Sequence, residues 1–99
     1  MKTEAKTRLG FVGIIIESRE RSANIVNQIL SEHGEMIVAR VGLPRREQHC
    51  SVITLVVDTD TDELGRLTGR LGQVPGVSVK SALGKIPCEP IAADRPENK

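Results

Sequence analysis

The segment from Thr7 to Glu17 is apolar in both of its alternating rows of side chains. Its odd-numbered row contains Leu9, Phe11 and Ile15, and its even-numbered row contains Val12, Ile14 and Ile16. A strand on a half-solvated sheet alternates apolar and polar residues, so two apolar rows predict a central strand whose two faces are both covered. The segment from Cys50 to Asp58 has the same pattern and predicts a second central strand.

After Ser18 the apolar spacing changes to three and four residues, which predicts an amphipathic helix that ends near His33. Ser18 is the expected N-cap, and Gly34 is the expected left-handed stop. The face that this helix would bury contains Ala23, Val26, Ile29, Leu30 and His33.

A second helix is expected to begin at Asp60, where Glu63 three residues later completes a capping-box pattern. Its buried stripe is expected to contain Leu64, Leu67 and Leu71. Gly65 and Gly69 would each cost about 1 kcal/mol relative to Ala. Alternatively, these two glycines would allow the helix to approach the sheet closely.

Two further strands carry polar residues that are typical of sheet edges. The segment from Glu35 to Leu43 has Arg40 opposite its apolar row, and the segment from Val77 to Leu83 has Ser78 and Lys80 in its outer row. The apolar row of the first of these contains Ile37, Ala39, Val41 and Leu43. The order βαββαβ with right-handed crossovers predicts an α+β, ferredoxin-like sandwich, a four-stranded antiparallel sheet with two helices on one face.

Composition narrows the functional classes. The chain has 99 residues, which is one domain, with one aromatic residue and 14 Lys plus Arg against 13 Asp plus Glu. Neither base stacking nor electrostatic attraction to DNA or to an anionic membrane is therefore expected. The N-terminal residues lack the hydrophobic core of a signal peptide, and no apolar run could span a bilayer, so we expect a cytoplasmic protein with reduced cysteines.

The ends of the chain are polar or rich in proline and charge. We expect residues 1–6 to be a disordered lead, residues 7–84 to form the domain, and residues 85–99 to be a flexible tail.

His33, His49, Cys50 and Cys88 are the candidate ligands for a transition metal. They show no CxxC or HxH spacing, and adjacent residues on a strand point to opposite faces, so we expect neither a metal nor another cofactor. His33 fits the C-terminal end of a helix equally well. A metal sensor that uses His49, Cys50 or Cys88 remains an alternative.

The loop from Pro44 to His49 offers Arg45 and Arg46 to an anion, because the guanidinium fork recognises carboxylate and phosphate. A solvated hairpin loop is the alternative. The carboxylates between Asp58 and Glu63 are explained by a helix cap, and no cysteine has an obvious base beside it. We therefore expect no catalytic residue and no enzyme activity.

Three stretches, which cover roughly residues 8–84, resemble a known family: GFVGIIIESRE, ILSEHGEMIVARVGLPRRE and ITLVVDTDTDELGRLTGRLGQVPGVSVKSAL. They resemble the iron-only hydrogenase system regulators, whose domain is ACT-like and similar to the C-terminal domain of nickel regulators. The resemblance implies an oligomeric regulatory module with a ligand near the loop after the first strand, here Ser18 and Arg19. That loop lacks the Pro-Gly of typical ACT domains, and six residues before the first strand are too few for a DNA-binding ribbon-helix-helix.

We therefore expect a regulatory module that forms a dimer or tetramer and responds to a small-molecule effector or a protein partner. The candidate ligand-binding residues are Ser18, Arg19, Arg45, Arg46 and His49. Direct DNA binding is not expected without a partner protein. The alternatives are the metal sensor, a transcriptional regulator linked to iron-only hydrogenase, and a purely structural oligomerisation domain.

The oligomer interface is expected on the sheet face that the helices leave uncovered. Its residues are expected to be Val12, Ile14, Ile16, Val52, Thr54 and Val56. The residues expected to pack under the helices are Ile53, Leu55, Val57, Val77 and Val79. Because both rows of the first strand are apolar, that strand leaves the assignment of the two faces open.

Overall fold

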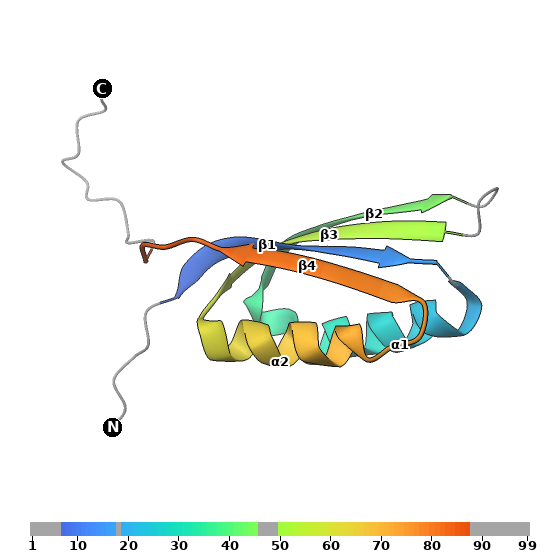
Figure 1. The fold of residues 1–99 in the computed structure, drawn as a ribbon. Helices are drawn as coiled ribbons and strands as arrows, with labels where there is room; N and C mark the ends of the chain where they lie inside the picture. The colour runs from blue at the N-terminus through green and yellow to red at the C-terminus, as the bar shows by residue number, and fades with distance from the viewer. Residues whose placement is uncertain (1–6, 18, 46–49, 88–99) are drawn as a thin grey trace.

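The computed structural model describes residues 7–17, 19–45 and 50–87, which form one sheet and a layer of helices (Figure 1). In chain order the elements are β1 (Arg8–Ile16), α1 (Arg19–Glu32), the 3-10 turn η1 (Gly34–Met36), β2 (Ile37–Arg45), β3 (Cys50–Thr59), α2 (Thr61–Gly72) and β4 (Val77–Leu83). The expected lead at 1–6 and the tail beyond residue 87 lie outside the described residues. Over the part that is described, the predicted order βαββαβ is confirmed.

The sheet has the strand order β2-β3-β1-β4, and each neighbouring pair is antiparallel. β1 and β3 are therefore the central strands and β2 and β4 the edges, as the two apolar rows of each central segment predicted. Both helices lie against the same face of the sheet (Figure 1). The α+β ferredoxin-like sandwich is thus confirmed, and one face of the sheet carries no described element.

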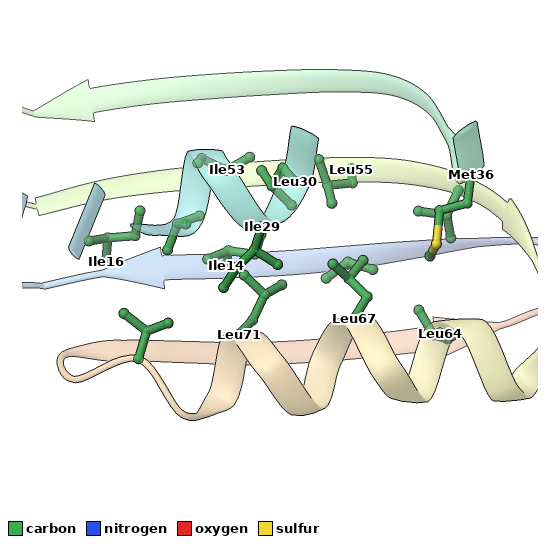
Figure 2. Close-up of a cluster of buried hydrophobic side chains, with 14 residues drawn as sticks. Ile14, Ile16, Ile29, Leu30, Met36, Ile53, Leu55, Leu64, Leu67 and Leu71 are labelled. Atoms are coloured by element: carbon green, nitrogen blue, oxygen red, sulfur yellow. The ribbon is translucent and has the colours of Figure 1, made fainter. Parts of the chain in front are cut away.

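The core lies between this sheet and the two helices. Figure 2 shows side chains from β1, β3, α1 and α2 pointing toward one another in this layer. The largest fully buried side chains are Val12, Ile14, Ile16, Val26, Leu30, Leu55, Val57, Leu67 and Leu71. Full burial of a side chain of this size contributes about 1.5–3 kcal/mol. The predicted helix stripes are confirmed at Val26, Ile29 and Leu30 in α1 and at Leu64, Leu67 and Leu71 in α2.

The face assignment of β1 in the expected interface is wrong. Val12, Ile14 and Ile16 are 0–1% exposed and pack under the helices, so none of them lies on the uncovered face. The reason is the register, in which Ile14 lies opposite Ile53. Directly opposed residues of an antiparallel pair point to the same face. The even-numbered row of β1 therefore joins the row of β3 that was correctly predicted to lie under the helices, with Val77 and Val79 packed beside it.

Two expectations about glycines are wrong: the left-handed stop at Gly34, and the close approach to the sheet at Gly65 and Gly69. α1 ends at Glu32, and Gly34 begins η1 instead of a left-handed stop. Gly76, with φ 75°, is the glycine with a positive φ among the described residues, and it lies in the turn before β4. Gly65 and Gly69 lie on α2, and a side-chain carbon added at either would have nothing within 4 Å, so close approach to the sheet does not explain them.

The predicted start of α2 is confirmed. Asp60 is the N-cap, and its Oδ1 accepts a hydrogen bond of 2.8 Å from the backbone N–H of Glu63. The carboxylate of Glu63 does not return to the cap, since it pairs with Arg66 at 2.8 Å. No helix among the described residues is long and apolar enough to cross a membrane.

Candidate functional site

The sheet face opposite the helices exposes many large apolar side chains, and we call it the open face. It is formed by Leu9, Phe11, Gly13 and Ile15 of β1, Ala39, Val41 and Leu43 of β2, Val52, Thr54, Val56 and Asp58 of β3, and Ser78, Lys80 and Ala82 of β4. The pairing of the strands places these residues in rows across the sheet. One row, for example, contains Val41, Thr54, Gly13 and Lys80.

Large apolar side chains dominate the open face. Seven of them are between 37% and 67% exposed: Leu9, Phe11, Ile15, Val41, Leu43, Val52 and Val56. Together they present on the order of 600 Å² of surface, at the upper end of the largest apolar patch on a typical monomer. An antiparallel sheet with one solvated face would carry polar residues at these positions. The amino-acid composition of the open face is therefore typical of a surface that another molecule covers.

Three of the six residues predicted for the interface lie on this face. Val52, Thr54 and Val56 lie on the open face as expected, whereas the β1 residues of the face are Leu9, Phe11 and Ile15. The contribution of Val41 and Leu43 was not predicted. They reach the open face because a bulge between Ile37 and Ala39 shifts the register, so the apolar row of β2 is split between the two faces.

Gly13 makes a hollow near the middle of the open face. A side-chain carbon added at Gly13 would have only the carbonyl oxygen of Lys80 within 4.0 Å. Its neighbours in the row are Thr54 and Lys80, both exposed. A glycine inside a strand is typical of a place where a ligand or another chain approaches the backbone closely. The hollow is thus an open recess beside the prominent side chain of Phe11.

The predicted ligand-binding residues are only partly placed. Ser18, Arg46 and His49 lie outside the described residues; Arg19 begins α1 and Arg45 ends β2, and their side chains are also outside the described part. The backbone does bring two of these positions to one end of the sheet. Arg45 pairs with Cys50, one step beyond the pair of Ile16 and Ser51 at the end of β1. The loop after β1 and the loop between β2 and β3 therefore begin at the same end.

The candidate metal ligands are not brought together within the described residues, where no three His, Cys, Asp or Glu side chains form a group that could hold an ion. Cys50 is half-buried at the start of β3. His49 and Cys88 lie outside the described part, so the metal-sensor alternative stays a hypothesis.

His33 takes part in a contact between the two helices. Arg70 Nη1 of α2 lies 2.7 Å from Glu32 Oε1 and 3.2 Å from His33 Nε2. The hydrogen bond from Arg70 and its positive charge lower the pKa of the Glu32 carboxyl below its ordinary value. The contact is exposed, so it orients the end of α1 more than it stabilises the fold.

An acidic cleft of about 790 Å³ lies where η1 meets the junction of β3 and α2. Its charged and titratable lining is Glu32, His33, Glu35, Asp58, Asp60 and Glu63. Three of these carboxylates already have structural partners, because Asp60 caps α2 while Glu63 and Glu32 pair with Arg66 and Arg70. The cleft makes this end of the molecule unfavourable for an anion.

Comparison with solved structures shows that the fold is similar to that of an ACT domain. The ACT domain of GTP pyrophosphokinase from Chlorobium tepidum matches with a TM-score of 0.66 at 22% identity, over 77% of this chain and 99% of that one. A formyltetrahydrofolate deformylase from Pseudomonas putida KT2440 matches with a TM-score of 0.54 at 13% identity, over 74% of this chain and 28% of that one. At these identities the likeness concerns the fold alone. No curated protein matches the chain.

The uncharacterized protein TM1266 from Thermotoga maritima is similar in both sequence and structure. It is 41% identical with a TM-score of 0.77, over 81% of this chain and 100% of that one. The model of the TM1266-like family, whose description gives an inferred role as an iron-only hydrogenase system regulator, matches residues 8–81. The match includes both helices and nearly all of the four strands. The chain therefore belongs to the TM1266-like family of iron-only hydrogenase system regulators.

Proposed function

We propose that this chain is a non-enzymatic regulatory module that works as a homo-oligomer assembled through its open face. The observation that carries the proposal is the set of large apolar side chains on that face, the most exposed being Val41 at 67%. Removing such a patch from water is favourable by roughly 25 cal/mol per Å² of apolar surface, before the costs of association. A second copy of the chain is always available to cover it.

Two further findings support a regulatory role. The family description names a regulator, and the ACT fold is shared with the domain of GTP pyrophosphokinase described above. The finer proposal is that this module controls the iron-only hydrogenase system through a partner protein. Because the charges of the chain nearly balance, direct DNA binding is not part of the proposal. Salt-sensitive retardation of DNA by the purified protein would contradict this point.

We also propose that a small-molecule effector binds at the end of the sheet where β1 and β2 finish. The support is the convergence of two backbone positions there, since Arg19 and Arg45 flank loops that begin at the same end. Binding residues concentrate on loops held by rigid elements. Native mass spectrometry of freshly purified protein tests this proposal, because a retained effector would appear as added mass on the assembly.

The test of self-association uses two isoleucines that are equally exposed. Ile15 lies on the open face and Ile25 lies on α1, and each is 41% exposed. A charge at Ile15 would have to be desolvated in the interface, so Ile15→Lys should dissociate the oligomer. Ile25→Lys changes the same residue type outside the open face and should leave the assembly intact. Equal sedimentation of both variants and the wild type would contradict the proposal.

A further inference from the structure

The open face carries a projection and a recess side by side. Phe11 is the one aromatic residue of the chain and is 54% exposed. Gly13, two residues further along β1 and on the same face, has open space where a side chain would lie. Alternate residues of a strand are about 7 Å apart, so the phenyl ring and the recess are immediate neighbours on the surface. The ring does not fill the recess of its own strand, because no atom of Phe11 lies within 4 Å of a side-chain carbon placed at Gly13.

This pair is self-complementary under a two-fold axis. An isologous dimer requires that residue i of one copy meet residue j of the other and the reverse. Consider two copies that stack their open faces, with the two-fold axis between the two sheets, perpendicular to β1 and level with Val12. This axis exchanges position 11 of one copy with position 13 of the other. It places the ring of Phe11 over Gly13 of the second copy in both directions. The same axis exchanges positions 9 and 15, so Leu9 meets Ile15 of the second copy.

The other strands fit the same axis at most positions. The exception lies at the end of the sheet, where the exchange of positions 9 and 15 places Val52 beside the exposed carboxylate Asp58 of the second copy. Lys80 shares a row with Gly13, and Ala82 shares a row with Phe11, so the axis places Lys80 beside the small side chain of Ala82 in the second copy. The two lysines therefore do not face each other. β4 is an edge strand, and a lysine stem can lie along apolar surface while its ammonium group reaches water. In β3, Thr54 meets Val56 of the second copy by the same exchange.

An axis parallel to the strands fits less well. It exchanges residues within one row across the sheet. With the axis over β1, Phe11 meets Phe11 and Gly13 meets Gly13 of the second copy; with the axis between β1 and β3, Phe11 meets Val56 and Gly13 meets Thr54. With the axis between β1 and β4, Phe11 meets Ala82 and Gly13 meets Lys80, so a charged side chain would have to enter the recess and be desolvated there. In none of these arrangements does a large apolar side chain fill the recess. Sheets stack about 10 Å apart with interdigitated side chains, and an unfilled recess forfeits packing.

We propose that two copies stack their open faces about this perpendicular two-fold axis, with Phe11 of each copy inserted over Gly13 of the other. The inference rests on the proposed self-association through the open face and adds the register in which the strands of the two copies align. It makes Phe11 and Gly13 the residues that set how the copies align.

The experiment uses two complementary variants of the full chain. Phe11→Gly removes the projection, and Gly13→Phe fills the recess, so each variant alone should raise the dimer dissociation constant at least tenfold. An equimolar mixture should recover a dimer, because every ring in one copy then faces a glycine in the other. The double variant F11G/G13F should also associate, since it merely exchanges the two positions. Sedimentation velocity measures these four samples and the wild type at the same total concentration.

The outcomes separate this inference from the proposed function. A monomeric wild type would overturn both. A dimeric wild type with no recovery in the mixture would overturn the Phe11–Gly13 register and leave self-association through the open face standing. The structure leaves room for a side chain at Gly13 within one copy, and circular dichroism checks that each variant is folded. If Gly13→Phe does not fold, Phe11→Ala and Gly13→Leu are mixed instead. Recovery of a dimer in that mixture is the expected result, and no recovery would overturn the register.

Discussion

Ile14 of β1 lies directly opposite Ile53 of β3, and the two side chains are 0% and 6% exposed beneath the helices. This single pairing decides which row of β1 enters the core and which row forms the open face. Ile15, the next residue, therefore lies on the opposite side of the sheet at 41% exposure. Two adjacent isoleucines thus lie in different environments, one in the core and one on the open face.

Alanine at these two positions should separate the roles. Ile14→Ala removes buried methyl groups and should destabilise the fold by about 2–5 kcal/mol, as in other large-to-small core substitutions. Ile15→Ala should change the stability of the isolated domain much less and weaken self-association instead. Urea unfolding at low protein concentration, where an oligomer dissociates and association adds little to the free energy of unfolding, measures the first effect. A larger loss for Ile15→Ala than for Ile14→Ala would mean that the faces are assigned wrongly.

The N-cap of α2 gives a second prediction. Asp60→Ala removes the carboxylate that accepts the backbone N–H of Glu63 and should cost about 1 kcal/mol. Asp62→Ala, a carboxylate in the first turn without the cap bond, is the matched control and should cost less, because it loses only the dipole interaction. Thermal unfolding of the two variants in the same buffer measures the difference. Identical melting curves would show that the cap bond contributes nothing.

The glycines of α2 predict a gain in stability. Gly69 lies in the helix with open space around it, so Gly69→Ala should stabilise the protein by about 0.4–1 kcal/mol through the unfolded chain. Gly76→Ala should act in the opposite direction, because φ 75° is a conformation that alanine adopts only with strain. Chemical denaturation compares the two. A loss of stability in G69A would point to a contact of Gly69 outside the single chain.

The pair of Glu32 and Arg70 predicts a dependence on pH. The pKa of Glu32 is lowered in the folded protein, chiefly by its hydrogen bond to Arg70. The pair therefore stabilises the fold above the unfolded pKa of about 4.3, and this stabilisation is lost as the pH falls through the lower folded pKa. Glu32→Gln should therefore differ from the wild type at neutral pH, and the two should converge in acid. Glu35→Gln, a neighbouring exposed carboxylate, is the control. A difference that grows in acid would reverse the assigned sign.

The sequence determined the fold through a few strong signals. The two apolar rows of β1 and β3 identified the central strands, and the three- and four-residue spacings located both helix stripes. The faces of β1 could not be assigned, because Leu9 and Phe11 are as apolar as Val12 and Ile14, and only pairing with β3 distinguishes them. The share of β2 in the open face depends on a bulge after Ile37, which no residue pattern marked. Three of the five predicted ligand residues, Ser18, Arg46 and His49, lie outside the described residues, so the structure does not test that part of the prediction.

The most direct test of the account is the mass of the wild-type assembly in solution. Sedimentation velocity from low to high micromolar concentration, in mild buffer without detergent, measures it for the full chain. We expect a dimer or a tetramer, because the open face leaves Phe11, Val41 and Leu43 more than half exposed in a single copy. A monomer across that whole range would contradict the claim that a second copy covers this face.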